Sequence, residues 1–291
     1  MFFKKKPKLW DETHEEYNKN VIDVNPYFNR RLSQNIDTKI RLYEDYIIND
    51  NNTWFIGELA DMLSFTKANV LRANMNYVIT DVDGIMYSQT KDVLQSAGYH
   101  TELLDVSKID YKSILTYQKS KQAIFVTYTP NQQELLEGFY SNLAYHIKDY
   151  AQQETPLMLV PVIPLPSCLC HNFNLVQCNA HMILYASGLR DIRKQYPGKL
   201  DDTTAFASIF IITGQHDEYT MSWISRKFQD VREFWALQET PKKRQNNIHY
   251  ECPIDRPPPQ KSKLVMLPSP QNDECYILVG FNKPMRDKKL V

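Results

Sequence analysis

The stretch Tyr77-Val-Ile-Thr-Asp81, followed by Val82-Asp83-Gly84, decides the fold class of this chain. An apolar run that ends in an acid and a glycine turn is typical of a buried strand whose carboxyl end lies at the edge of an α/β sheet. Two functions compete for this stretch. One is a phosphatase with Asp81 as its nucleophile. The other is an ATPase-type motor fold that has lost its phosphate loop, and we favour this second interpretation.

Composition narrows the choice of function. The chain has 291 residues, of which 43% are hydrophobic and 23% are charged, as in an ordinary folded protein. Lysine and arginine together number 34 and so do the acids, so no global basic field attracts the chain to nucleic acid or membrane. Only eight glycines are present, which counts against a glycine-rich nucleotide loop.

Alternating apolar and amphipathic segments predict an α/β fold with a mostly parallel sheet and helices on both faces. The expected strands are 54–57, 77–81, 102–106, 123–127, 181–185, 207–213 and 275–281. The expected helices are 58–75, 85–97, 131–150, 188–196 and 219–228. We expect a polar lead-in over residues 1–30, then a single domain over 31–291 in which 238–262 is a loop or linker. Ligands of such sheets bind beyond the carboxyl ends of the strands, here after Ile56, Thr80 and Thr127.

The first of these turns lacks the chemistry of a phosphate loop. Such a loop needs glycines whose amides close on the phosphates, a lysine, and a hydroxyl for magnesium. The segment Gly57–Lys67 offers one glycine and no Gly-Lys-Ser/Thr sequence, and it places Glu58 and Asp61 where phosphate charge would lie. These acids repel a triphosphate. Lys67 is a displaced substitute at best, and a solvated helix lysine is the simpler interpretation.

A motor also needs acids at the end of a second strand, where they hold magnesium and orient water. The segment that should carry them, Val160–Cys168, contains no acid and three prolines. Proline removes donors from the strand ladder, so this segment suits a sheet edge better than a sheet centre.

The phosphatase interpretation rests on Asp81-Val-Asp83-Gly84, which resembles the first motif of the haloacid dehalogenase superfamily. The resemblance implies that Asp81 attacks phosphorus, that Asp83 acts as acid and base, and that magnesium bridges them. The strand that ends at Thr127 resembles that family's second motif. The second acid cluster is missing, with Gly214–Asp217 as a weak candidate, and so we keep the phosphatase as an alternative.

The cysteines do not form a clear metal site. Cys168-Leu-Cys170-His171 resembles half of a zinc site, and Cys178 and His181 could supply the other half. Buried reduced thiols are the simpler interpretation. No stretch is apolar over the ~18–20 residues that cross a bilayer. From the cysteine pattern we expect no bound metal. From the lack of a long apolar stretch we expect a cytoplasmic location.

Read in order, several segments resemble the cytosolic motor domain of type IV coupling proteins, the RecA-like ATPases of conjugative DNA transfer. The quoted segments are Asn52–Gly57, Asn69–Asp81, Ala97–Tyr99, Leu103–Val106, Lys121–Phe125, Leu189–Tyr196, Ile211–Ser225 and Pro284–Lys289. The departures are systematic. The phosphate loop is degenerate, the acidic pair falls at Ser167 and Cys168, and both the helical insertion domain and the membrane segment are missing.

The resemblance implies a degenerate RecA-like domain that is not an enzyme, has no catalytic, cofactor-binding or metal-binding residues, and uses no cofactor. It implies binding to protein components of a conjugation or type IV secretion machine, including an active coupling-ATPase paralogue, at the inner face of the membrane. A DNA-binding accessory module is a further alternative. Its basic elements would be Lys4–Lys8, Lys242–Arg244 and Arg286–Lys289, although such runs are usually solvated tails.

Overall fold

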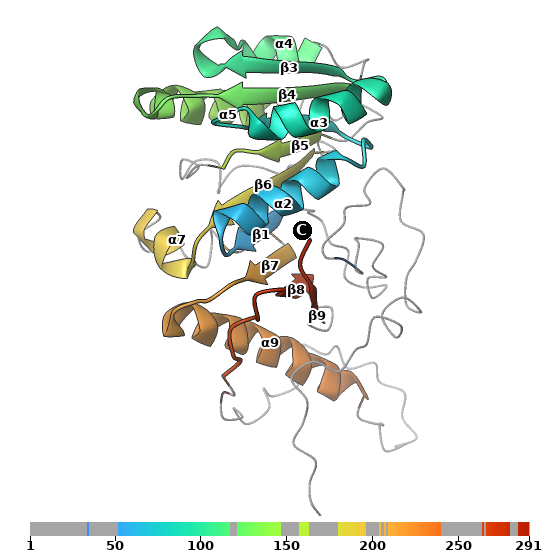
Figure 1. Cartoon of the computed structure of the whole chain (residues 1–291). Helices are drawn as coiled ribbons and strands as arrows, with labels where there is room; N and C mark the ends of the chain where they lie inside the picture. Colours follow the sequence, from blue (N-terminus) through green and yellow to red (C-terminus); the bar gives the residue numbers. More distant parts are fainter. Residues whose placement is uncertain are drawn as a thin grey trace, which may run out of the picture.

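The computed structural model describes residues 34, 52–116, 121–146, 157–162, 180–195, 204, 207, 209–239, 264, 266–279 and 285–290 (Figure 1). The predicted lead-in over 1–30 lies outside these residues. The strands are β1 (Thr53–Ile56), β2 (Asn76–Thr80), β3 (His100–Asp105), β4 (Gln122–Thr127), β5 (Leu157–Val160), β6 (Ala180–Ala186), β7 (Ile209–Thr213), β8 (Glu274–Val279) and β9 (Met285–Lys288). The helices are α2 (Leu59–Val70), α3 (Ile85–Ser96), α4 (Tyr111–Thr116), α5 (Gln133–His146), α7 (Leu189–Gln195) and α9 (Glu218–Glu239), with single turns η2 (Val106–Lys108) and η3 (Pro130–Gln132).

All nine strands form one sheet in the order β3-β4-β2-β5-β6-β1-β7-β8-β9. Strands β1 to β7 run parallel, whereas β8 and β9 add antiparallel strands at one end. Parallel neighbours need crossover connections, and helices α2, α3, α4, α5 and α7 lie in the connections that the structure describes. The predicted mostly parallel α/β sheet is therefore confirmed.

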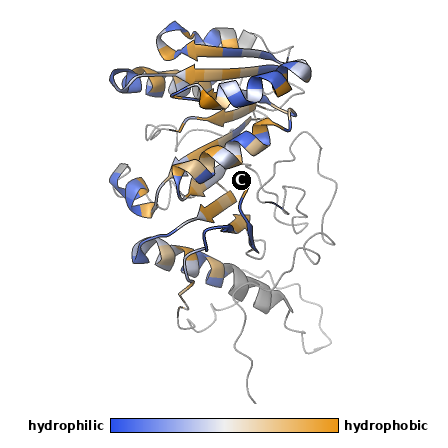
Figure 2. Ribbon diagram, in the orientation of Figure 1, coloured by the Kyte–Doolittle hydropathy of each residue, from blue (hydrophilic) through white to orange (hydrophobic). Residues whose placement is uncertain are grey.

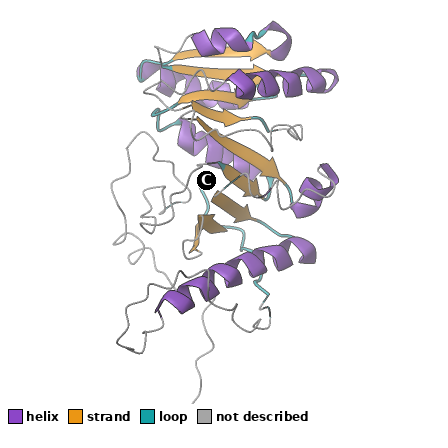
Figure 3. Cartoon of the chain, turned by 180° about the vertical axis from the view of Figure 1, so that it is seen from behind, coloured by secondary structure: helices purple, strands orange, loops and turns teal. Residues whose placement is uncertain are grey.

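The two faces of the sheet bury different helices. Side chains alternate along each strand, so Phe55, Tyr77 and Phe125 pack with α2 and α3. Their strand neighbours pack on the other face with α4, α5, α7 and α9. Helices α2 and α3 cross in front of the sheet in Figure 1, and Figure 3 gives the view from behind. Figure 2 shows that the strands are apolar along most of their length, as expected for a sheet covered on both faces.

Helix α3 shows how local sequence sets an element's bounds. It follows the turn after β2, where Gly84 adopts a left-handed backbone with φ 69°. It ends just before Gly98, which has φ 84° and whose N–H bonds back to the Gln95 carbonyl. Glycine adopts this conformation without the steric cost that a side chain adds. The predicted helix end at Gly98 is confirmed.

Helix α4 was not predicted, α2 ends at Val70 where residue 75 was expected, and three further elements differ from the predictions. The strand before the proline-rich segment is Leu157–Val160, and it lies at the centre of the sheet between β2 and β6, so the predicted edge position is wrong. The prolines do not interrupt it because the strand ends before Pro161. Helix α9 is longer than predicted and includes the first two residues of the expected 238–262 loop; the rest of that loop lies outside the described residues. Strand β9 was not predicted.

The segment between β3 and β4 is short. Its described residues form only η2 and α4, and they contain no inserted helical domain. Across the residues that the structure describes, no helix combines the length and the apolar character needed to cross a membrane.

Candidate functional site at the carboxyl edge of the sheet

The carboxyl ends of the parallel strands meet at one edge of the sheet. Strand β1 leads into α2 on one face, whereas its neighbours β6 and β7 lead into α7 and α9 on the other. The same reversal separates β2, which leads into α3, from β4, which leads into α5. Crevices at such reversals are where open α/β sheets bind ligands. The three turns singled out from the sequence all lie at this edge.

The turn after β1 is too short to be a phosphate loop. Gly57 and Glu58 alone connect the strand to α2, which begins at Leu59. The Gly57 N–H donates to the Ala186 carbonyl at 3.0 Å, so it already has a partner in β6. A Cβ placed on Gly57 would lie 2.2 Å from Thr213 Oγ1 and 2.8 Å from the Thr213 carbonyl oxygen. The chain is therefore packed directly against β7 where a loop around phosphates would need open space.

The charges near this turn do not favour a triphosphate. Of the two acids that were predicted to repel it, Glu58 and Asp61, only Glu58 has a charge that no described residue pairs. Glu58 is exposed at the turn and lies beside Gly214. Asp61 is buried, and its Oδ1 lies 2.6 Å from Lys289 Nζ, so its charge is neutralised. Lys67 lies in the last turn of α2, eight residues beyond Leu59, which corresponds to about 12 Å along the helix. The predicted pair of repelling acids is thus reduced to Glu58.

A histidine that was not singled out from the sequence, His216, lies just beyond the carboxyl end of β7. Burial holds the pKa of His216 below its usual range, while hydrogen bonds to the backbone of Thr213 and Ile56 oppose this shift. Its backbone N–H donates to Ser269 Oγ at 3.3 Å. Among the described residues, its buried Nε2 has no hydrogen-bond partner. Burial therefore makes the positively charged form of this ring less favourable.

On the β6 side, two carboxylates lie near Tyr185. Burial raises the pKa of Tyr185, and the charges of Asp191 and Glu58 raise it further. Asp191 Oδ1 lies 3.9 Å from Lys194 Nζ, so a cation of α7 balances part of this negative charge. What opposes a nucleotide at the carboxyl end of β1 is therefore the closed backbone of the turn, to which Glu58 adds one exposed negative charge.

Asp81 serves as a helix cap at the turn after β2. Its buried carboxylate accepts the N–H groups of Met86 at 3.2 Å and Tyr87 at 2.7 Å, the first turn of α3. Burial raises the pKa of Asp81, and these two hydrogen bonds oppose the rise. Asp83 accepts the Ile85 N–H at 3.2 Å. Both acids thus satisfy helix amides that otherwise lack partners.

The candidate that the sequence offered for the second acid cluster of a phosphatase is not near Asp81. The candidate at Gly214–Asp217 follows β7, which is four strand spacings from β2 in the sheet order. At about 4.8 Å per spacing this is about 19 Å. Asp217 instead caps α9 through the Thr220 N–H at 2.8 Å and pairs with Arg190. Thr127 donates its hydroxyl to the Leu104 carbonyl at 3.3 Å.

A buried tyrosine fills the space at the ends of β2 and β5. Tyr140 of α5 donates its hydroxyl to the Val160 carbonyl at 3.2 Å, and the same oxygen lies 2.9 Å from Thr80 Oγ1. Burial raises the pKa of this phenol, so it stays neutral. Ser167 and Cys168, the predicted positions of the lost acidic pair, lie outside the described residues.

The candidate metal half-sites lie mostly outside the described residues. No cluster of three or more metal-binding side chains exists within the described parts of the chain. His181 is buried in β6 and Cys275 in β8, where burial raises the pKa of its thiol. Cys168, Cys170, His171 and Cys178 lie outside the described residues.

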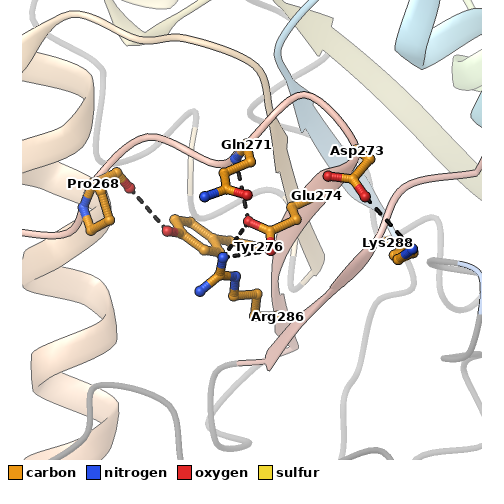
Figure 4. Close-up of polar contacts among 7 residues, drawn as sticks. All are labelled: Pro268, Gln271, Asp273, Glu274, Tyr276, Arg286 and Lys288. Atoms are coloured by element: carbon orange, nitrogen blue, oxygen red, sulfur yellow. Dashed lines mark hydrogen bonds and ion pairs between the residues drawn. The ribbon is translucent and has the colours of Figure 1, made fainter.

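The basic run Arg286–Lys289 is part of the fold, which corrects its interpretation as a solvated tail. It forms β9 and the residue after it, and its cations pair with acids (Figure 4). Arg286 binds Glu274 on the neighbouring strand, and Lys288 Nζ lies 3.7 Å from Asp273. With Lys289 paired to Asp61 as well, this run has little charge left for DNA. The other two runs, Lys4–Lys8 and Lys242–Arg244, lie outside the described residues.

Comparison with models of protein families and with curated proteins finds no match. Among solved structures, the chain is similar to the crystal structure of B204, the DNA-packaging ATPase from Sulfolobus Turreted Icosahedral Virus. The identity is 12%, the TM-score is 0.46, and the match covers 84% of this chain and 98% of B204. A likeness this distant decides neither the activity nor the ligand of the present chain.

Proposed function

We propose that this chain is a catalytically inactive relative of coupling ATPases that acts by binding protein components of a conjugation or type IV secretion apparatus. The observation that carries the proposal is the two-residue turn between β1 and α2, in which Gly57 is packed against Thr213. Nucleotide hydrolysis on such a sheet requires a loop there that surrounds the phosphates. The sequence resemblance to coupling proteins supplies the choice of apparatus.

The packed turn does not prevent the chain from acting as a structural partner. Each face of the sheet packs with helices through a cluster of buried side chains, so the domain can present fixed surfaces. A subunit of this kind occupies a position beside an active coupling-ATPase paralogue and contributes an interface in place of catalysis. Such a role places it at the inner face of the membrane through its partners.

Two measurements test the proposal. The first is equilibrium binding of a fluorescent ATP analogue with magnesium to the full chain, together with release of phosphate from ATP. We expect neither binding nor turnover, and also none for Glu58→Gln, because removing the acid does not open the turn. Turnover by the purified wild-type chain would contradict the inactive assignment, and saturable binding of the analogue would contradict the closed turn.

The second measurement concerns partners. The tagged full chain, expressed in its native host with the transfer apparatus present, should recover a coupling ATPase or another component of that apparatus. Recovery of the same components by an unrelated tagged protein of similar charge would identify background. Failure to recover any such component above that background would contradict the proposed binding to the transfer apparatus.

A further inference from the structure

Helices α7 and α9 together form a groove lined by cations and an aromatic ring. The hollow has a volume of about 490 Å³ and is lined by Arg190, Arg193, Lys194 and Tyr219. The three cations lie at spacings of three and four residues, so they share one side of α7. Their side chains are exposed, with 64% of Arg190 and 79% of Lys194 accessible to solvent.

The groove is held in place by contacts between the two helices. The Leu189 N–H at the start of α7 donates to Thr220 Oγ1 of α9 at 3.1 Å. The Arg193 guanidinium lies 5.8 Å from the centre of the Tyr219 ring, and Tyr219 packs against the buried core. A cation over an aromatic face is attracted by the ring's electron density. The fixed ring therefore positions Arg193 before any ligand arrives.

Acids around the groove limit what it can bind. Arg190 Nε lies 3.3 Å from Asp217 Oδ2, and Lys194 Nζ lies 3.9 Å from Asp191 Oδ1. With exposed Glu218, the three cations of the groove face three acids, so the local charge sums to zero. Arg193 is different, because no carboxylate of the described residues lies within ion-pairing distance of it.

This balance favours a protein ligand over a nucleic acid. Binding to nucleic acid depends on many phosphate contacts along a continuous positive surface. A phosphate chain crossing this groove would meet Asp191, Asp217 and Glu218 in turn. A partner segment with one or two well-placed carboxylates can reach Arg193 and Lys194 and avoid these acids. Arginine also suits carboxylates because its planar fork donates two parallel hydrogen bonds.

We infer that the α7–α9 groove binds an acidic segment of a partner protein, with a carboxylate on Arg193 and Lys194 and an apolar side chain beside Tyr219, whose ring face Arg193 covers. The inference rests on the proposed function, since it names the surface through which the chain binds. The surface continues along α9, where Lys227 Nζ lies 5.4 Å from the centre of the Trp223 ring. Trp223 and Lys227 follow Tyr219 at helical spacing, so a bound segment can extend along the same side of α9.

The test measures fluorescence anisotropy of a labelled peptide that carries two glutamates and one phenylalanine among uncharged residues, with the full chain as titrant. The same peptide with glutamine in place of glutamate is the control probe. Labelled oligo(dT) represents the alternative ligand class, a single-stranded nucleic acid. We expect the acidic peptide to bind best, with affinity that falls as salt is added. The double variant Arg193→Ala/Lys194→Ala should weaken this binding about tenfold, the value expected for two exposed charge-assisted contacts.

A matched control has the same charge change elsewhere. Lys108→Ala/Lys112→Ala, on η2 and α4 at the β3 end of the sheet (Figure 1), should leave peptide binding unchanged. A second variant, Arg193→Lys, keeps the charge but loses the planar fork, and it should weaken binding several-fold while keeping the fold. Binding by a variant is compared with binding by the wild type only where the two proteins have the same melting temperature.

Three results would overturn the inference. They are the absence of peptide binding, equal loss in the control double variant, and tighter binding of oligo(dT) that the Arg193→Ala/Lys194→Ala change removes. The last result would identify a nucleic-acid surface instead. None of these outcomes affects the ATP-binding measurement, so failure of this inference and failure of the inactive assignment are distinguishable.

Discussion

Replacing Gly57 by alanine perturbs the closed turn in the most direct way. The added methyl group would lie 2.2 Å from Thr213 Oγ1 and 2.8 Å from the Thr213 carbonyl oxygen. The hydroxyl can rotate away, but the carbonyl belongs to β7, which is fixed between β1 and β8. Overpacking of this kind usually costs about 1–3 kcal/mol. We expect Gly57→Ala to lower the free energy of unfolding by about 2 kcal/mol.

Thermal unfolding followed by circular dichroism measures this change. A loss of about 2 kcal/mol corresponds to a fall in melting temperature of roughly 4–8 °C for a chain of this size. The double variant Gly57→Ala/Thr213→Ala removes the hydroxyl contact and keeps the carbonyl contact. Its loss of unfolding free energy should therefore be smaller than the sum of the losses in the two single variants. Gly138→Ala is the matched control, because a Cβ there meets nothing within 4 Å and the residue lies inside helix α5.

The control should raise stability by roughly 0.5–1 kcal/mol, since alanine favours a helix interior over glycine. If Gly57→Ala is as stable as the wild type while the control behaves as expected, the turn after β1 has room for at least a methyl group. The packed-turn argument against a phosphate loop would then fail.

Three further predictions concern buried polar groups. Lys289→Ala should lower the free energy of unfolding by about 3 kcal/mol, because it leaves the buried Asp61 carboxylate unpaired. Lys288→Ala, which breaks an exposed pair, should lower it by less than about 1 kcal/mol. Urea unfolding compares the two variants, and equal losses would contradict the buried pairing. Tyr140→Phe should cost about 1–3 kcal/mol in the same assay, because it leaves a buried carbonyl and hydroxyl without their partner, and no loss would mean that these hydrogen bonds are absent. Burial raises the pKa of Asp81 above its ordinary 3.8, so the native state holds that proton more tightly. The stability that this proton contributes is full below pH 3.8 and is lost as pH rises through the native pKa. Over that pH window the wild type should lose stability relative to Asp81→Asn. Parallel profiles of stability against pH for the two proteins would refute this prediction.

The layers of the fold could be predicted from sequence because they depend on local patterns. Apolar runs such as Val78-Ile79 identify buried strands, and glycines such as Gly98 end helices. The order of strands in the sheet depends on long-range pairing, which these patterns do not encode. The prolines of Val160–Cys168 favoured a sheet edge because they remove ladder donors, but the strand Leu157–Val160 ends before them and pairs on both sides at the centre of the sheet.

The candidate site was predictable only in part. The missing glycines and the absent lysine are visible in the sequence around Gly57, and the short turn agrees with them. The Asp61–Lys289 pair joins residues 228 positions apart, so the sequence could not show that Lys289 neutralises the acid. Likewise, the groove on α7 and α9 appears only when Arg193 and Tyr219 come together in the fold, although each lies on a predicted helix.

The central claim is that the carboxyl end of β1 cannot hold a triphosphate. A crystal of the full chain soaked with a non-hydrolysable ATP analogue and magnesium tests it most directly. The account predicts no phosphate density beside Gly57 and Glu58, with the turn still packed against Thr213. Phosphate density there, with the turn displaced from β7, would contradict it.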